Sequence, residues 1–296
     1  MLVKKIDIHV HCALEKEVPR FWGDGDDFAT PDEMRVMWDR WGIEKGLQLP
    51  VVTSDHTTHP LTNQEAMQLV KQHPDMFYWF CNVDPRWGEN NDKTDHSQYL
   101  NWYKARGAKG VGEITSNMYF DDPIVWNLFR HAEKCEMPIL FHIGNMGSDY
   151  GLVDELGLPR LEKTLKEFPN LLFIGHSQKF WAEISGDCTE EGRNGYPEGK
   201  VTPGGRVVEL LDKYPNLHGD LSAGSGGNAI MRDEEFGLWF LEKYQDRLYF
   251  GTDICSPKNV FLLPDYLDEC VKNGKLSETA YNKICRENAL RLLEGK

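Results

Sequence analysis

Asp7-Ile8-His9-Val10-His11 stands at the end of an apolar run that begins at Ile6, close to the N-terminus. In a β-strand, the side chains at positions i and i+2 point to the same face. His9 and His11 can therefore present two imidazoles to one point, as a metal ion requires. Two histidines alone are a modest indication, so the rest of the chain decides how much weight the pair carries.

Strand-like and helix-like segments alternate along the chain. Nearly continuous apolar runs, such as 138–143 and 171–174, are typical of strands covered on both faces of a parallel sheet. This alternation predicts a single (β/α)₈ TIM barrel over residues 1–296, without an accessory β-sandwich domain. A doubly wound open sheet is the alternative, but it favours a glycine-rich turn after the first strand. Strands are expected near 4–11, 46–52, 77–83, 108–114, 138–144, 170–176, 216–222 and 247–252.

Capping motifs between these runs predict where several helices start. Thr30-Pro31-Asp32-Glu33 combines a threonine N-cap, a proline at the first helical position and a capping-box glutamate. Thr62-Asn63-Gln64-Glu65 repeats the capping box, and Asp122-Pro123 starts another helix. Further helices are expected over 95–106, 157–168, 204–214, 228–244, 260–273 and 278–293.

Residues that can bind a metal recur at the ends of the predicted strands. They occur in Gly112-Glu113, Phe141-His142, Gly175-His176 and Thr252-Asp253. In a closed barrel, the carboxyl ends of the strands converge on one face, where the following loops build the active site. We therefore expect these four residues to join the first two histidines in one mixed nitrogen and oxygen site. Such donors suit Zn²⁺, and also Mn²⁺, Fe²⁺ or Ni²⁺.

Composition narrows the class of protein. A hydrophobic content of 40% and a charged content of 27% are those of a soluble globular protein, and no apolar stretch approaches the ~20 residues that span a bilayer. The N-terminus enters a strand within a few residues, so we expect no signal peptide and a cytoplasmic protein. The net charge of −14 argues against a nucleic-acid partner. The seven cysteines are scattered and are expected to be reduced thiols.

Two long irregular segments follow strands, and both would lie on the catalytic rim of a barrel. They span 12–29 and 177–203, and are rich in glycine. Loops of this length in a compact domain are usually lids, binding loops or disordered, and the sequence does not decide among these.

The strand-end residues, in this order, resemble the amidohydrolase superfamily, most closely its family-2 branch of short barrels. The likeness extends from the first histidine pair to the closing helix at 287–293. It implies that His9, His11, His142 and Asp253 hold a first divalent metal ion, with Zn²⁺ preferred. His176 is then either a ligand of a second ion or a catalytic histidine beside a single one. Glu113 falls where binuclear relatives place a bridging carboxylate and some mononuclear ones a substrate or metal contact.

The resemblance also implies roles in catalysis. The metal lowers the pKa of a bound water, Asp253 takes the proton and passes it to the leaving group, and His176 stabilises the developing oxyanion. Asp7 shares the histidine face one pleat deeper, and we interpret it as a supporting group rather than a ligand.

Candidate substrate contacts come from other rim positions. Arg86 and Lys179 could pair with a substrate carboxylate, although surface ion pairs are an equally good interpretation. Tryptophans near a metal site suggest a planar substrate, but also pack barrels as core residues; the candidates are Trp22 and Trp181. His56 and His59 follow the second strand on the rim, where they could contact the substrate, although a solvated loop is the preferred interpretation.

The first functional hypothesis is a metal-dependent hydrolase of a small-molecule amide, ester or lactone. The sequence is also compatible with a homo-oligomer. The runner-up is a non-oxidative decarboxylase of an aromatic or muconate-type acid, which the same resemblance implies. A TatD-like deoxyribonuclease shares several of these motifs but is disfavoured by the negative charge. A catalytically inactive metal-binding barrel is disfavoured because every expected ligand position is filled.

Overall fold

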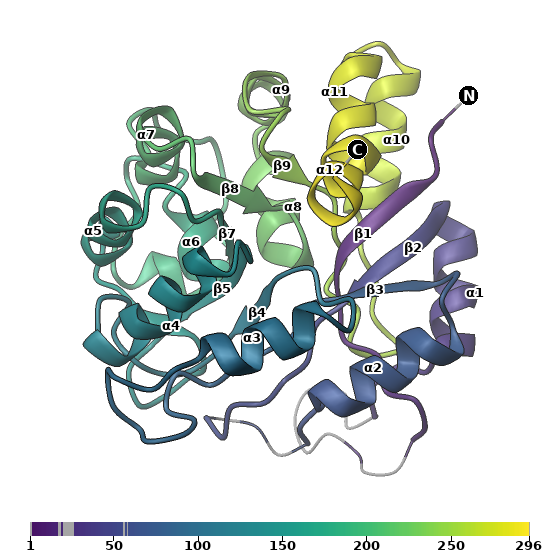
Figure 1. The fold of residues 1–296 in the computed structure, drawn as a ribbon. Coiled ribbons are helices and arrows are strands. Elements are labelled where there is room, and N and C mark those ends of the chain that lie inside the picture. The colour runs from purple at the N-terminus through teal and green to yellow at the C-terminus, as the bar shows by residue number, and fades with distance from the viewer. Residues whose placement is uncertain (1, 17–18, 20–26, 56, 58, 296) are drawn as a thin grey trace.

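Parallel strands closed into a barrel form the centre of the computed structural model (Figure 1), which describes residues 2–16, 19, 27–55, 57 and 59–295. The barrel strands are β1 Lys5–Val10, β2 Ile43–Gln48, β3 Phe77–Trp79, β4 Val111–Ile114, β5 Ile139–Gly144, β7 Phe173–His176, β8 Leu217–Asp220 and β9 Leu248–Tyr249. Two parallel sheets have the orders β1-β2-β3 and β4-β5-β7-β8-β9, with the short β6 Leu152–Val153 beside β5.

Isolated pairs join these two sheets into one barrel. Cys81 forms a parallel bridge with Val111, which connects the end of β3 to β4. On the other side, Val10 bridges Ile254, and the amide of Ile8 donates to the carbonyl of Phe250 at 3.1 Å. The expected (β/α)₈ barrel is therefore confirmed, and the described residues contain no β-sandwich beside it. The open doubly wound alternative does not fit, because both edges are paired.

Helices surround the strands in the βα order that a parallel barrel requires (Figure 1). Those that follow β1 to β5 begin within two residues of the predicted starts: α1 Pro31–Trp41, α2 Asn63–Gln72, α3 Ser97–Lys104, α4 Pro123–Lys134 and α5 Pro159–Glu167. The capping box of Thr30 and Glu33 is present, and the Thr62 hydroxyl accepts the amide of Glu65 at 3.1 Å. None of the helices in the described part of the chain is long and apolar enough to cross a membrane.

The C-terminal half contains more helices than the sequence pattern predicts. The single helix expected over 228–244 is two helices, α8 Ala223–Met231 and α9 Glu234–Lys243. They are separate because the Asp233 side chain accepts the amide of Phe236 and starts α9 anew. The remaining elements are α7 Arg206–Lys213, α10 Leu263–Lys272, α11 Glu278–Asn282, the π-helical turn Lys283–Glu287 and α12 Asn288–Glu294.

The segment 177–203 is more ordered than a long irregular loop. It starts with α6 Gln178–Ala182 and contains a 3₁₀ turn at Gly192–Asn194. Arg193 of this turn is fully buried, and its Nη2 lies 2.7 Å from Oε1 of the buried Glu183. This ion pair lies within the segment, and Nη1 of Arg193 donates to the carbonyl of Asp154 at 3.0 Å, which ties the segment to the chain after β6. Much of 12–29 lies outside the described residues.

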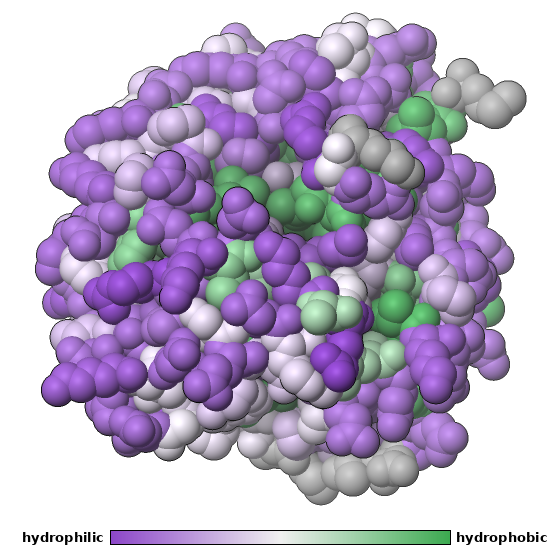
Figure 2. Space-filling view, viewed as in Figure 1, coloured by the Kyte–Doolittle hydropathy of each residue, from purple (hydrophilic) through white to green (hydrophobic). Residues whose placement is uncertain are grey.

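Figure 2 shows that the face seen in Figure 1 is largely hydrophilic, with apolar side chains gathered in a hollow near its middle. Most large apolar residues are instead buried, and Trp38, Trp79 and Trp181 are among the largest fully buried side chains. Burial of this apolar surface is the main favourable term in the stability of the barrel.

Candidate metal centre

His9 and His11 converge as the strand geometry predicts. They end β1, and their Nε2 atoms lie 3.1 Å apart. Nδ1 of His9 is 2.7 Å from Oδ2 of Asp220, and Nδ1 of His11 is 2.9 Å from the carbonyl oxygen of Leu49. A neutral imidazole whose Nδ1–H donates to an oxygen presents a lone pair at Nε2. Two lone pairs directed at each other at this distance fit a shared cation between them, so the donor chemistry fits a divalent metal.

Asp253, which follows β9 where the barrel closes against β1, lies beside the same two Nε2 atoms. Its Oδ1 lies 3.4 Å from Nε2 of His9 and 3.5 Å from Nε2 of His11. Its amide donates to the carbonyl of His9 at 2.8 Å, which places the carboxylate. Its φ of 61° is in the left-handed region, which aspartate tolerates better than most residues. The side chain is 27% exposed, whereas the histidines are buried, so Asp253 links the cluster to the space outside it.

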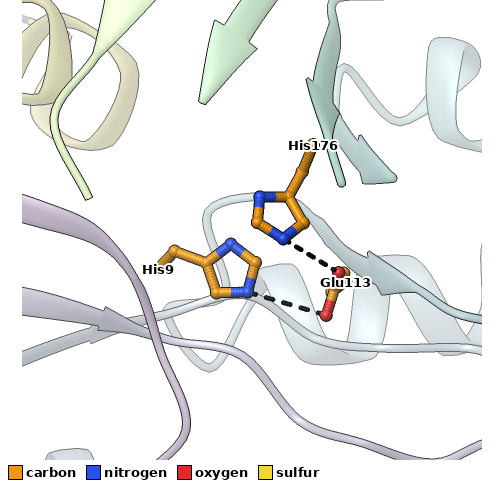
Figure 3. Close-up of side chains that lie close together, drawn as sticks. All are labelled: His9, Glu113 and His176. Carbon is orange, nitrogen blue, oxygen red and sulfur yellow. Dashed lines mark ion pairs between the residues drawn. The ribbon is translucent and has the colours of Figure 1, made fainter. Parts of the chain in front are cut away.

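Glu113, in β4, lies between two pairs of histidines. Its Oε2 is 3.6 Å from Nε2 of both His9 and His11. Its Oε1 is 2.8 Å from Nδ1 of His142 and 3.9 Å from Nε2 of His176. Figure 3 shows this carboxylate between His9 and His176, with one oxygen toward each ring. One carboxylate thus faces both halves of the cluster.

His176 is the last residue of β7, and its Nδ1 side is held by Ser222 and Asp220. Its Nδ1 lies 3.0 Å from the Ser222 hydroxyl and 3.1 Å from Oδ2 of Asp220, while its Nε2 faces Oδ2 of Asp253 at 3.7 Å. Within the described residues, two groups have donor atoms that all lie within 4.8 Å of one another: His9, Glu113 and His176, and His9, His11 and Asp253. The structure therefore brings all six predicted ligands to one place, with His142 attached through Glu113.

Asp220, the last residue of β8, is the buried carboxylate that the sequence interpretation missed. Its Oδ2 contacts both His9 and His176. Burial opposes its charged form, but these two imidazoles outweigh burial and hold the pKa of Asp220 well below its usual range. Asp220 lies within the predicted strand at 216–222, so the strand-end rule that selected Glu113 also covers it.

The cluster carries strong negative potential. Burial works against protonation of His9, but Asp253, Glu113 and Asp220 raise the pKa of His9 well above its usual value. Burial likewise opposes the charge on Glu113, yet the neighbouring histidines lower its pKa. A site that attracts positive charge in this way also favours a bound cation.

Asp7 is not a ligand but joins β1 to the segment after β9, in agreement with its interpretation from the sequence as a supporting group. It accepts the hydroxyl of Thr252 and, at 2.9 Å, the amide of Thr252, and it accepts the amide of His9 at 3.1 Å. Burial, partly offset by these hydrogen bonds, raises the pKa of Asp7 to about 7. These contacts tie the end of β1 to the segment that carries Asp253.

A pocket of about 110 Å³ opens beside Asp253. Its lining combines members of the cluster with a mostly apolar wall. The described lining residues are His11, Phe28, Val51, Thr57, His59, Glu113, Thr115, Tyr150, Asp253 and Cys255. Tyr150, which the sequence interpretation did not select, packs with its ring centroid 4.5 Å from that of His142. His59 lies in a loop, as expected, and its side chain, 15% exposed, also lines this pocket.

For three of the candidate substrate contacts, the structure shows the alternative interpretation, an ion pair or a core position. Arg86 forms ion pairs within the protein, because its Nη2 lies 2.6 Å from carboxylate oxygens of both Asp55 and Asp84. Lys179 is 4% exposed and is not among the residues that line the pocket. Trp181 is a core residue whose indole donates to the carbonyl of Asp220 at 2.8 Å. Trp22 lies outside the described residues.

The sequence matches the amidohydrolase family model over residues 6–295. The chain belongs to the amidohydrolase family. No curated protein matches this amidohydrolase chain.

Solved structures agree with the amidohydrolase barrel. An uncharacterized TIM-barrel protein from Bordetella bronchiseptica has a TM-score of 0.70 and 16% identity, covering 99% of this chain and 100% of that one. The 5-carboxyvanillate decarboxylase of Novosphingobium aromaticivorans, solved with manganese and 4-hydroxy-3-methoxy-5-nitrobenzoic acid, has a TM-score of 0.63 and 15% identity, with 99% and 96% coverage. The probable 2-pyrone-4,6-dicarboxylic acid hydrolase of Acinetobacter baumannii, with bound citric acid, has a TM-score of 0.56 and 14% identity, with 99% and 100% coverage. At these identities the likeness shows the fold alone.

Proposed function

We propose that this amidohydrolase is a metal-dependent hydrolase of a small-molecule amide, ester or lactone. The observation that carries the proposal is the position of Glu113, whose two oxygens face two different histidine pairs. A carboxylate so placed can bridge two cations, which is a recurring arrangement in hydrolytic metal centres. His9, His11 and Asp253 would hold one ion. His142, which the resemblance assigned to that same ion, lies beside Oε1 of Glu113 and the His176 ring, so His142 and His176 would hold the other.

A divalent cation bound there supplies a Lewis acid and lowers the pKa of water, so that a nucleophile is available near neutral pH. Zn²⁺ is the preferred ion for this donor set, and Mn²⁺, Fe²⁺ or Ni²⁺ also suit it. The buried histidines fix the positions of the donors, because Asp220 and the Leu49 carbonyl hold their Nδ1 atoms.

Asp253 is the proton carrier in this proposal. It contacts the histidine pair and is the most exposed of these ligands, so its carboxylate reaches both the cluster and the pocket. It can accept the proton of the attacking water and return it to the leaving nitrogen or oxygen. His176, if it binds no ion and its ring is protonated on both nitrogens, can donate from Nε2 to an oxyanion that forms beside Asp253.

A second candidate is a non-oxidative decarboxylase of an aromatic carboxylic acid. The lining of the pocket favours it, because Phe28, Val51 and Tyr150 make an apolar wall that suits a planar ring. A manganese-containing decarboxylase is also among the similar folds. Glu113 and His176 would then contact the substrate beside a single ion.

Metal analysis separates the two candidates. Mn²⁺ or Zn²⁺ bound to the purified chain is measured by mass spectrometry for wild type, Glu113→Ala and His176→Ala. The hydrolase proposal expects two equivalents in the wild type and one in each variant. One equivalent, unchanged in both variants, overturns the binuclear hydrolase and supports the decarboxylase. Glu191→Ala and His73→Ala, which change residues away from the cluster, serve as matched controls.

A further inference from the structure

A second pocket, with a volume of about 370 Å³, opens at the end of the barrel opposite the metal cluster. Its lining includes residues that lie just before three of the strands: Lys109 before β4, Pro138 before β5 and Leu172 before β7. This N-terminal end of a TIM barrel normally contributes to stability, whereas catalysis takes place at the other end. The pocket is therefore separate from the chemistry proposed above.

Helix α12 covers this end of the barrel with one face only. Ala289 and Leu293 belong to the same buried apolar cluster as Ile174 of β7. Arg291 and Leu292, on another face of the helix, line the pocket. The helix thus packs on the barrel and at the same time contributes a cation to the pocket.

Two hydrogen-bonded rings contribute polar atoms to the lining. Nδ1 of His218 in β8 lies 2.9 Å from the hydroxyl oxygen of Tyr249 in β9, and the two rings stack with centroids 5.6 Å apart. The interior layers of a TIM barrel are normally filled by branched apolar side chains. A histidine and a tyrosine here place hydrogen-bonding atoms where packing alone favours aliphatic residues.

Two cations of the lining have no carboxylate partner. Lys109 and Arg291 are exposed and form no ion pair within the part of the chain that the structure describes. Glu136, the one acidic residue among the described lining residues, has Oε2 at 3.8 Å from Nζ of Lys104. The pocket therefore carries a surplus of positive charge, although the chain as a whole has a net charge of −14.

The pKa values of the two rings reflect the same positive charge. Burial lowers the pKa of His218 to about 3, and Arg247 and Arg291 add to this effect. Burial raises the pKa of Tyr249, whereas Arg291 acts in the opposite direction. Arg291 thus lies close enough to act on both rings, and a positive potential of this kind attracts an anion.

We propose that this pocket is a second ligand site, which binds a small organic oxyanion with a compact apolar body. Arg291 and Lys109 bind the oxyanion, to which a guanidinium offers two parallel donors. Leu171, Leu172 and Met137 of the lining pack against the apolar body. The volume is in the range of pockets for small organic ligands and exceeds what an inorganic oxyanion alone would fill. The site does not rest on the proposed function, because it shares no residue with the metal cluster.

The test compares benzenesulfonate with benzyl alcohol in the Zn²⁺-loaded full chain. Benzenesulfonate carries an oxyanion that stays singly charged near neutral pH, whereas benzyl alcohol has the same ring without a charge. Binding is followed by the NMR signals of the His218 ring, which are assigned from their absence in His218→Gln. Wild type is expected to show saturable shifts of these signals with benzenesulfonate, and about tenfold weaker binding of benzyl alcohol, as for loss of a charge-assisted hydrogen bond.

Arg291→Gln and Lys109→Gln are each expected to weaken benzenesulfonate about tenfold and to leave benzyl alcohol unchanged, because each removes a charge and keeps most of the side chain. Arg130→Gln and Lys71→Gln are the matched controls, since both residues are exposed and lie outside the pocket. Circular dichroism of each variant verifies that it folds. No shift of the His218 signals with benzenesulfonate, equal binding of the two probes, or wild-type affinity in either pocket variant overturns the proposal.

Repetition without added metal separates this inference from the proposed function. The shifts of His218 and their loss in Arg291→Gln should be the same with and without Zn²⁺, because the pocket contains no ligand of the metal cluster. A chain that binds no metal, yet shows this dependence on Arg291, refutes the hydrolase proposal and retains the second site. Normal metal binding without the dependence refutes only the second site.

Discussion

His9 and Asp220 face each other where β1 and β8 end, with Nδ1 of the imidazole 2.7 Å from Oδ2 of the carboxylate and both side chains fully buried. The carboxylate accepts the Nδ1–H, which fixes the tautomer and directs the Nε2 lone pair at the candidate metal position. Because the same oxygen also contacts His176, Asp220 orients both histidines.

Asp220→Asn should therefore weaken metal binding without removing a ligand. An amide can donate as well as accept and carries no charge, so it no longer enforces one tautomer of His9. We expect affinity for Zn²⁺ or Mn²⁺ to fall about 10- to 100-fold, as for other residues that orient metal ligands. Competition with a chromophoric chelator measures it. The exposed Asp39→Asn is the control, and an affinity equal to that of wild type would falsify the orienting role.

Gly251→Ala should perturb the same residue by crowding. A Cβ at position 251 would lie 2.9 Å from Oδ1 of Asp220 and 2.9 Å from Cβ of Ser222. Because both neighbours are buried, they have little room to move. We expect weaker metal binding and a lower unfolding temperature. Gly195→Ala, where a Cβ meets no atom within 4 Å, should change neither quantity; equal effects of the two substitutions would contradict the crowding argument.

Asp253→Asn should abolish turnover while the fold remains. The amide keeps the size of the carboxylate but cannot accept and return a proton, so we expect a rate about 10³-fold lower. Steady-state kinetics with an activated ester, together with the metal content and circular dichroism of the same sample, measures the effect. Asp265→Asn on the surface of α10 is the control. Substantial residual activity at unchanged metal content would refute the proton-carrying role.

We expect His218, which lies at the end of the barrel opposite the metal cluster, to make the unfolding free energy depend on pH. Burial, with smaller contributions from Arg247 and Arg291, lowers the pKa of His218 to about 3. The unfolded chain then binds a proton near pH 6.5 that the folded chain does not, so stability is complete above that pH and is lost as the pH falls. By about pH 5 this group should account for roughly 2 kcal/mol of lost unfolding free energy.

His218→Gln should remove that part of the pH dependence. Urea denaturation at about pH 7.5 and about pH 5 measures the difference for both proteins. His73→Gln, at the end of α2, serves as the comparison. If wild type and His218→Gln lose the same free energy between the two pH values, the imidazole is not held neutral by burial.

Strand periodicity alone was enough to predict much of the fold and the composition of the cluster. The i, i+2 spacing of His9 and His11 places both on one face, and the placement of Glu113, His142 and Asp253 near strand ends brings them to one rim of a barrel. Helix starts at Thr30 and Thr62 were equally legible, because capping depends on neighbouring residues in the sequence. The break between α8 and α9 was missed, although the charged run Arg232-Asp233-Glu234-Glu235 interrupts the apolar pattern there and contains the cap residue Asp233.

Only the tertiary structure decided which polar residues are available to contact a substrate and which are paired within the protein. Arg86 is ion-paired with Asp55 and Asp84, and Trp181 is buried in the core, whereas His59 lies beside Asp27 at the pocket. These outcomes depend on pairs of side chains from different loops, whose relative positions no local pattern encodes. The His9-x-His11 pair was thus set by the sequence, but the carboxylate that orients it, Asp220, lies 211 positions away and becomes its neighbour only when the barrel closes.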